Sequence, residues 1–364
     1  MRKKERYTTQ AATIGFCVTA LGDLLIQWLE HHDRGEKLTW NSYDGNRTLK
    51  NAMYGGAIGA GIGCSLYDLT SAINRSKYFN SNEYLKAILK NRDLKNNPDL
   101  YQNAILVRDK LKIQLLEIFA NTLVSVPENT GSFVRSTANI GSYDIDILLP
   151  FRKRSFSSLE EMFIYTFEKI KSKLNHQQNV SVYKKTKSIG ISFEREGDEI
   201  YFDIVPGREI GDYKLDNKLN LFVNSNSLWK RNGSFKIDTS LQRKITNNRP
   251  NERKIIRLLK MYNSENNLNI PKVIIEQSVV LALSDDNFGL FSSITDNLLN
   301  SMMFLSDILR KSQFIDWGNS SNNLLLKMSS SERDKARITL RNDVEMIESN
   351  EHYLKDVFEN IIIY

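Results

Sequence analysis

Two aspartates, Asp144 and Asp146, lie one residue apart in an apolar segment that continues as Ile147-Leu148-Leu149. Alternate side chains of a β-strand share a face, so the two carboxylates should project together. Like charges at this spacing repel each other unless they share a proton or bind a cation. A hard divalent cation with oxygen ligands is the natural solution, and Mg²⁺ held by carboxylates and substrate phosphates is its usual form.

A third carboxylate should come from another strand, because one strand cannot surround two ions. Asp203 in EIYFDIVP is the best candidate, since it lies on the face opposite Ile200 and Phe202. Three carboxylates around two Mg²⁺ or Mn²⁺ ions, about 3.5–4 Å apart, make a phosphoryl-transfer site. Asp144, Asp146 and Asp203 are therefore the predicted catalytic and metal-binding residues.

Gly131-Ser132, a dozen residues before the aspartates, is the expected phosphate cradle. Glycine lets the backbone approach a ligand closely. Ser132 offers a hydroxyl and an amide at the start of a short helix, FVRST, whose free N–H groups would attract an anion.

These residues together resemble a known family. Gly131-Ser132, Asp144-x-Asp146 and Asp203 in DIVP look like the polymerase-beta type nucleotidyltransferase fold. More narrowly, GSFVRST…SYDIDILLPF is similar to the GS-x-x-R-G-T…S-D-I-D signature of the oligoadenylate synthetase and cyclic GMP-AMP synthase branch. That branch includes the bacterial cyclic-oligonucleotide synthases (CD-NTases). Ser136 replaces the usual glycine, and the resemblance covers roughly residues 99–364.

The resemblance implies further substrate contacts. NERKIIRLLKMYN is similar to the helix whose lysine grips the donor triphosphate, here Lys260. Arg257, one helical turn earlier, could assist the triphosphate or pair with a nearby acid. Lys187 could contact substrate phosphates or lie on a solvated edge. We expect Glu276 to pair with a buried cation rather than to act as a catalytic base. Arg135 is expected to support the loop structurally.

The pattern of apolar residues predicts an α+β fold in three parts. Residues 1–98 form a helical extension, 99–250 a nucleotidyltransferase core with a mixed sheet, and 251–364 a helical domain that completes the nucleotide cleft. In the core we expect a helix over 101–126 and a second after Ser157. The strands should be VSVYKKT, SIGISFER and EIYFDIVP, the last two joined by a turn at Gly197-Asp198.

The composition narrows the class of protein. The 364 residues carry a net charge of +7, which favours polyanionic partners, nucleoside triphosphates first. The basic residues are dispersed, so no stable nucleic-acid partner is predicted. Two cysteines without CxxC spacing and four scattered histidines argue against a disulfide framework and a zinc site, and they favour a cytoplasmic setting.

The N-terminal extension holds two apolar stretches, residues 11–29 and 52–67. Glycines at positions 55, 59 and 63 would let two helices approach closely. A packed hairpin or an oligomer contact is favoured over membrane association, which stays open as the alternative. A secretion signal is disfavoured, because a nucleotide-using domain would find no substrate outside the cell.

The resulting interpretation is a metal-dependent nucleotidyltransferase that makes a short or cyclic oligonucleotide second messenger from nucleoside triphosphates. The resemblance implies bacterial antiphage signalling, in which a separate effector protein responds to the product. One alternative is an enzyme of the same fold that transfers a nucleotide to an RNA end or to a protein. The other is a non-catalytic nucleotide-binding or membrane-associated scaffold.

Overall fold

The computed structural model describes residues 79–140, 144–174, 176–177, 179–195, 198–224, 233–284 and 290–358, together with residues 12, 20, 47–50 and 52–53. Contacts divide the chain into two units, Met1–Phe79 and Asn80–Tyr364. Apart from a few helical positions, the two N-terminal apolar stretches lie outside the described residues. The predictions made for them therefore stay predictions. Within the described part of the chain, no helix combines the length and apolar character needed to cross a membrane.

The second unit is built on a mixed sheet, which has seven strands among the described residues. The strands are β1 (Glu128–Thr130), β2 (Ile145–Phe151), β3 (Val180–Lys184), β4 (Ile189–Arg195), β5 (Asp198–Glu209), β6 (Lys218–Val223) and β7 (Gly233–Asp238). Their order is β1-β2-β5-β4-β3, and β6 pairs with both β5 and β7. Strands β2 and β5 are parallel, whereas every other pair in this sheet is antiparallel.

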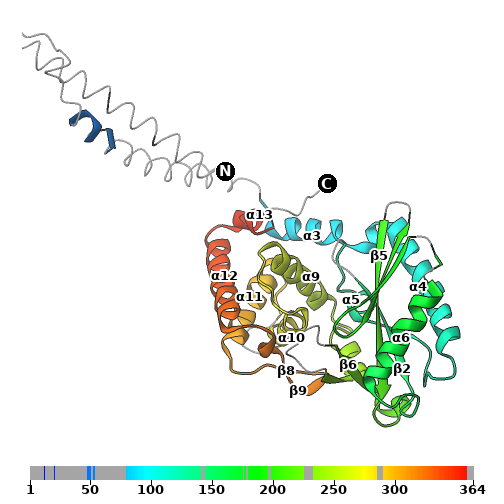
Figure 1. Cartoon of the computed structure of the whole chain (residues 1–364). Helices are drawn as coiled ribbons and strands as arrows, with labels where there is room; N and C mark the ends of the chain where they lie inside the picture. Colours follow the sequence, from blue (N-terminus) through cyan, green and yellow to red (C-terminus); the bar gives the residue numbers. More distant parts are fainter. Residues whose placement is uncertain are drawn as a thin grey trace, which may run out of the picture. The chain divides into compact units, whose positions relative to one another are not determined.

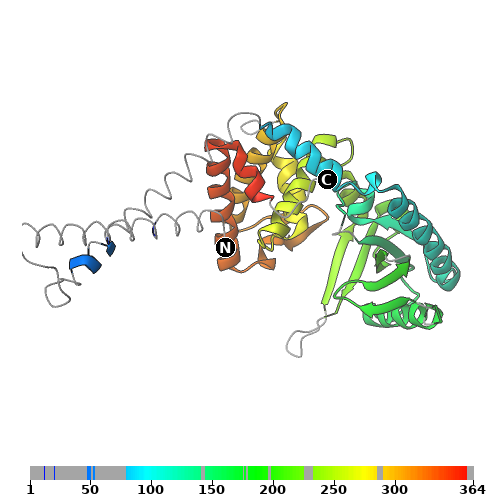
Figure 2. The ribbon, with the colours of Figure 1, turned by 90° about the horizontal axis from the view of Figure 1, so that it is seen from above.

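Helices cover the sheet and form the C-terminal half (Figures 1 and 2). They are α3 (Ser81–Asn91), α4 (Pro98–Phe119), α5 (Gly131–Val134), α6 (Leu159–Leu174), α7 (Tyr213–Asp216), α8 (Thr239–Lys244), α9 (Pro250–Glu265), α10 (Lys272–Ala282), α11 (Ile294–Arg310), α12 (Ser330–Ser349) and α13 (Leu354–Val357), with 3₁₀ turns at Leu94–Asn96, Leu324–Lys327 and Glu351–Tyr353. The predicted α+β class is confirmed.

Strand alternation decides which face of the sheet is buried. Ile145 and Ile147 of β2, with Phe202 and Ile204 of β5, join the core formed by α4 and α6. The side chains between them, Asp146 and Asp203 among others, must then project from the opposite face. Burying the isoleucine face under two helices thus fixes the side on which the aspartates appear.

The compact unit begins earlier than the predicted boundary near residue 98. Helix α3 is capped by the side chain of Asn80, which accepts from the Glu83 amide at 3.1 Å. It buries Leu85 and Ile88 and contacts α9 and α11. The segment expected as part of a separate extension therefore packs as part of the core unit.

Two other local expectations were wrong. The helix predicted to continue to residue 126 ends at Phe119, because the chain then joins the sheet: Leu123 bridges Phe151, and the Val124 amide donates to the Pro150 carbonyl at 2.8 Å. The helical C-terminal half is also interrupted by a hairpin of β8 (Ile315–Asp316) and β9 (Asn319–Asn323). The turn expected at Gly197-Asp198 lies partly outside the described residues, although β4 and β5 do pair antiparallel on either side of it.

Candidate active site

One row of paired residues crosses five strands of the sheet. Thr130 pairs with Asp146, Asp146 with Asp203, Asp203 with Gly190, and Gly190 with Tyr183. Paired residues share a face of a sheet, so the row lies on the face opposite α4 and α6. Parallel pairing of β2 and β5 therefore places Asp146 and Asp203 side by side, as the sequence predicted.

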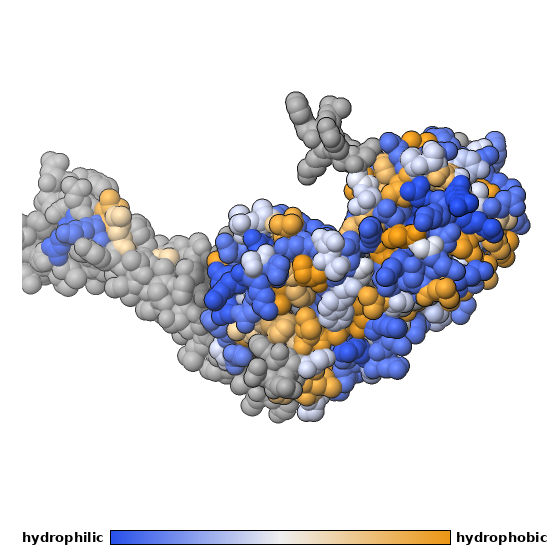
Figure 3. All heavy atoms as spheres, turned by 90° about the horizontal axis from the view of Figure 1, so that it is seen from below, coloured by the Kyte–Doolittle hydropathy of each residue, from blue (hydrophilic) through white to orange (hydrophobic). Residues whose placement is uncertain are grey.

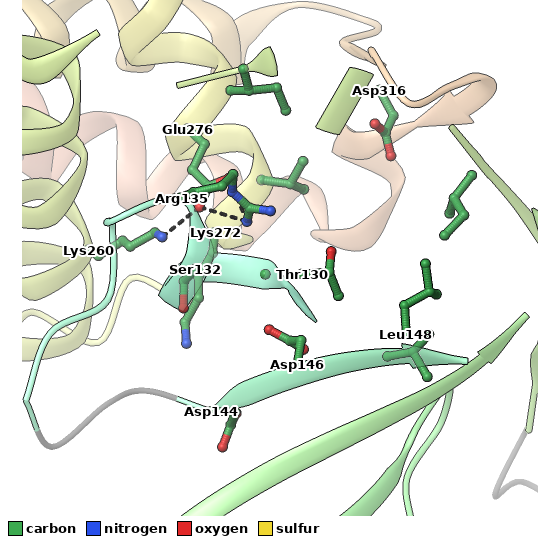
Figure 4. Close-up of a pocket in the computed structure, with 15 residues that line it drawn as sticks. Thr130, Ser132, Arg135, Asp144, Asp146, Leu148, Lys260, Lys272, Glu276 and Asp316 are labelled. Atoms are coloured by element: carbon green, nitrogen blue, oxygen red, sulfur yellow. Dashed lines mark hydrogen bonds and ion pairs between the residues drawn. The ribbon is translucent and has the colours of Figure 1, made fainter. Parts of the chain in front are cut away.

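Asp144 is placed less directly. It precedes β2 and lines the same pocket as Asp146. In Figure 4 its carboxylate lies at the strand end, turned away from that of Asp146. Within the part of the chain that the structure describes, no three carboxylate, imidazole or thiol side chains are gathered closely enough to hold an ion as they stand. The expected trio thus lies in one region without forming a closed ligand set.

The charges around Asp146 are unbalanced. Burial, and after it the neighbouring Asp203 carboxylate, raises the pKa of Asp146 to about 7; Asp144 adds to the rise, whereas Arg135 and Lys185 oppose it. Burial likewise raises the pKa of Asp203. A divalent cation would relieve this repulsion, and carboxylate oxygens are the ligands that Mg²⁺ and Mn²⁺ prefer. The charges and oxygen atoms of Asp146 and Asp203 therefore fit the expected ions, which these two side chains would hold.

Gly131 is required where it stands. Its φ of +74° lies in the left-handed region, and a Cβ built on it would be 1.6 Å from Oδ2 of Asp146. Only glycine allows the backbone to pass this close to the carboxylate. Helix α5, which begins here, spans four residues, too few for the helix-terminus attraction that the sequence suggested. The expected phosphate contact thus depends on the Ser132 hydroxyl and on local amides.

Ser136 stands where the signature has glycine. Its φ is +56°, the left-handed conformation that favours glycine. A serine thus holds a backbone conformation that would be less costly for glycine.

Gly131→Ala should lower both stability and activity. Left-handed backbone costs a residue with a Cβ about 1–2 kcal/mol, and the methyl group would displace the Asp146 carboxylate. Thermal unfolding and nucleotide incorporation would measure the two losses. Gly233→Ala is the matched control, because among the described residues a Cβ there would meet Val223 alone, at 3.8 Å. Equal behaviour of the two variants would contradict this role of Gly131.

A buried ion network forms the wall next to Ser132 (Figure 4). Lys260 Nζ lies 2.6 Å from Glu276 Oε1, and Arg135 Nη2 lies 3.1 Å from Glu276 Oε2. Lys260 also donates to the hydroxyl of Thr137 at 3.0 Å. Although burial alone would raise the pKa of Glu276, the two cations hold it below its usual value. The structure thus shows the pairing predicted for Glu276, and this wall carries one excess positive charge.

These groups meet in a pocket of about 390 Å³. Its lining joins the sheet, α5 and α10, and consists of Thr130, Gly131, Ser132, Arg135, Asp144, Asp146, Leu148, Val205, Ile237, Ile245, Lys260, Lys272, Val273, Glu276 and Asp316. A neighbouring cavity of about 270 Å³ shares Ser132, Lys260 and Lys272 with it and is otherwise lined by polar side chains. Figure 3 shows one face of the molecule, with hydrophilic residues over most of the described surface and apolar residues nearer its centre.

Sequence reasoning missed two lysines at the site. Lys185 Nζ lies 2.7 Å from Asp203 Oδ1. Burial would lower the pKa of Lys185, but the close ion pair with Asp203 outweighs burial and raises it. Lys272 begins α10 and lines both cavities. Lys272 could have been expected near the site because it follows Pro271 at the start of a helix. For Lys185 the sequence offers only its place in the lysine-rich run of residues 184–187 (KKTK).

Two expected substrate contacts lie elsewhere. The Arg257 guanidinium binds Asp93 at 3.0 Å, Asn139 Oδ1 at 3.0 Å and the Leu89 carbonyl at 2.9 Å. Arg257 therefore connects α9 to the segment after α3 and does not line the pocket. Of the two predicted roles, it has the pairing with a nearby acid.

Lys187 also falls outside the pocket lining. Its Nζ lies 3.5 Å from the centroid of the Phe235 ring. Burial, helped by the nearby Lys327, lowers the pKa of Lys187 to about 8. Lys187 is thus half-buried, which fits neither a phosphate contact in this pocket nor a solvated edge.

Sequence comparison finds no protein-family model and no curated protein that matches the chain. Comparison with solved structures finds extensive matches. CdnC of E. coli MS115-1, solved with ATP, aligns with a TM-score of 0.60 at 16% identity over 77% of this chain and 98% of that chain. In another structure CdnC is in complex with HORMA-deltaN.

Two further solved structures have the same fold. The Bradyrhizobium diazoefficiens CD-NTase CdnG, in complex with GTP, aligns with a TM-score of 0.61 at 11% identity over 76% of this chain and 95% of that chain. Vibrio cholerae DncV, a cyclic AMP-GMP synthase and prokaryotic cGAS homolog, aligns with a TM-score of 0.52 at 13% identity over 66% and 70%. The chain therefore has the fold of the CD-NTases.

Proposed function

We propose that this chain is a metal-dependent nucleotidyltransferase that joins nucleoside triphosphates and releases pyrophosphate. The observation that carries the proposal is the pairing of Asp146 with Asp203 on one sheet face, beside a pocket whose opposite lining includes Ser132 and Lys260. Acidic side chains that attract metal ions thus lie next to groups that attract phosphate. The CD-NTase fold supports the same chemistry.

Each residue has a role in this proposal. Asp144 and Asp146 would hold both ions, and Asp203 the ion next to the attacking hydroxyl. Bound there, the ions would lower the pKa of that hydroxyl and neutralise charge on the leaving pyrophosphate. Ser132 would donate to the donor triphosphate, and Lys260 would contribute its positive charge while Glu276 keeps the ammonium in position.

The reaction itself is a displacement at phosphorus. The ribose hydroxyl of one nucleotide attacks the α-phosphorus of the other, a new P–O bond forms, and the bond to pyrophosphate breaks. The hydroxyl proton needs an acceptor, and we propose an oxygen of Asp203 for this role.

The product is proposed to be a short or cyclic oligonucleotide that acts as a second messenger. This part rests on the signature resemblance and on the CD-NTase fold. A separate effector protein would respond to the product, in bacterial antiphage signalling. Residues 11–67 remain a proposed contact for self-association or for a membrane surface.

The test is direct synthesis. The purified full chain is incubated with α-labelled nucleoside triphosphates, singly and in mixtures, with Mg²⁺ or Mn²⁺. We expect phosphatase-resistant small products, identified by mass spectrometry, and none after chelation of the metal. Label found only on added RNA or on a protein would support transfer to that acceptor instead. No incorporation under any condition would leave the scaffold interpretation.

A further inference from the structure

The turn between β3 and β4 brings a lysine to the acidic row. It spans Lys185 to Ser188, and the Lys185 amide donates to the Ser188 carbonyl at 2.9 Å. The Asn224 amide donates to the Thr186 carbonyl at 2.7 Å, which ties the turn to the end of β6. Two backbone bonds thus fix the point from which the Lys185 side chain starts.

The side chain reaches the third carboxylate. Lys185 Nζ lies 2.7 Å from Oδ1 of Asp203, and these side chains are 32% and 16% exposed. The same ammonium lies 5.7 Å from the centroid of the Tyr183 ring. That ring packs over Gly190, where a Cβ would come within 2.4 Å of it. Because Gly190 pairs with Asp203, the ring and the carboxylate border the ammonium.

Neighbouring lysines of the same run do not share this place. Lys184 lies 4.5 Å from the centroid of Phe167, a residue of α6 on the opposite face of the sheet. Lys187 lies over Phe235. Strand alternation therefore selects Lys185 from the run, and Lys184 is a natural control of equal charge and length.

We propose that Lys185 is a tethered counter-cation, which pairs with Oδ1 of Asp203 in the absence of nucleotide and must move away when a metal ion binds this carboxylate. The inference rests on the proposed function, because it assumes that Asp203 is a metal ligand. An ammonium at hydrogen-bond distance from Oδ1 and a divalent cation on the same carboxylate repel each other. The ion can bind fully only after the ammonium leaves.

This arrangement couples metal loading to nucleotide binding. A triphosphate in the pocket offers the released ammonium another anion. When nucleotide and metal bind together, Lys185 can therefore exchange its ion pair with Asp203 for one with the triphosphate at little cost in free energy. Metal alone must break the ion pair without that compensation. Lys185 thus weakens the binding of free cations at Asp203 as long as no nucleotide is bound.

Mn²⁺ binding to the nucleotide-free full chain tests the proposal. Electron paramagnetic resonance would give the Mn²⁺ dissociation constant for wild type, Lys185→Met and Lys184→Met. A partly exposed ion pair is worth up to about 1 kcal/mol, so Lys185→Met should bind Mn²⁺ about fivefold more tightly. Lys184→Met should match wild type. With a non-hydrolysable ATP analogue present, the difference between wild type and Lys185→Met should shrink.

Chemical labelling gives an independent reading of the wild-type chain. Acetylation of Lys185, followed by mass spectrometry, should become faster at saturating Mn²⁺ without nucleotide, relative to acetylation of Lys184, because no triphosphate is then present to pair with the released ammonium. A rate unchanged by Mn²⁺, or one that changes only in step with that of Lys184, would overturn the inference.

Asp203→Asn separates failure of this inference from failure of the proposed function. If Mn²⁺ affinity is insensitive to Asp203→Asn, the proposed metal site itself is wrong. If Asp203→Asn weakens Mn²⁺ binding but Lys185→Met leaves it equal to wild type or weaker, only the role of Lys185 is overturned. Absence of Mn²⁺ binding in both wild type and Lys185→Met would also overturn it. Circular dichroism melting, with Lys185→Gln as a second variant, checks that the fold persists.

Discussion

Asp146→Asn is expected to reduce nucleotide incorporation by on the order of 10³-fold or more. Asparagine keeps the volume of the side chain and its place beside Gly131 but loses the charge that attracts a cation. Catalytic metal ions supply several kcal/mol of transition-state stabilisation, and each ~1.4 kcal/mol corresponds to a factor of ten in rate. Initial rates with labelled ATP and GTP would measure the loss.

The same substitution should leave the fold intact. It removes a buried charge that Asp203 repels, so the melting temperature should equal or exceed that of wild type. Asp109→Asn, at an exposed side chain of α4, is the matched control and should retain full activity. An Asp146→Asn variant that keeps more than a tenth of the wild-type rate would refute the assigned role of this residue.

Glu276→Gln is expected to destabilise the protein at neutral pH by about 3–5 kcal/mol. The substitution keeps the shape of the side chain but leaves Lys260 and Arg135 buried without their counter-charge. Urea denaturation at pH 7 would measure the change in the free energy of unfolding. Glu83→Gln, in the exposed ion pair with Lys86, should change that free energy by less than about 1 kcal/mol.

The effect of Glu276→Gln should depend on pH with a defined sign. The two cations lower the pKa of Glu276 in the folded state, so the carboxylate stabilises the fold above its unfolded pKa of about 4.3. That contribution is lost as the pH falls through the lowered pKa. The difference between variant and wild type should therefore narrow below about pH 4. A difference that stays constant, or one below 1 kcal/mol at pH 7, would contradict this account.

Much of the site was accessible from the sequence because its parts are local. Alternation along IDILL determines which face Asp146 shares with other polar residues, and the three predicted strands are β3, β4 and β5. The Gly131-Ser132 pair lies where a close backbone approach is needed. Glu276 could be assigned to a buried cation because it lies in a strongly apolar helix.

The contacts that sequence reasoning missed are set by pairing between distant segments. Nothing in the sequence distinguishes Lys185 from its neighbours Lys184 and Lys187. Only the register of β3, β4 and β5 brings Lys185, and not the other two, to Asp203. Arg257 shares a helix with Lys260, but its partner Asp93 belongs to a polar segment that was expected outside the core. Once α3 packs on α9, that acid becomes the nearest counter-charge for Arg257.

The position of Asp144 also depends on more than alternation. It precedes the first paired residue of β2 and follows three residues outside the described part of the chain. Without a ladder partner its side chain is not held to the face of Asp146. Closure of the carboxylate set around metal ions is therefore expected to involve Asp144 turning and Lys185 moving away.

The central claim is that these aspartates assemble a two-metal site beside the triphosphate pocket. A crystal structure of the full chain with Mn²⁺ and a non-hydrolysable ATP analogue tests it most directly, through anomalous scattering from manganese. We predict two anomalous peaks about 3.5–4 Å apart, contacted by Asp146 and Asp203, with the triphosphate at Ser132 and Lys260. Manganese bound only away from these carboxylates, or a triphosphate bound outside this pocket, would contradict the account.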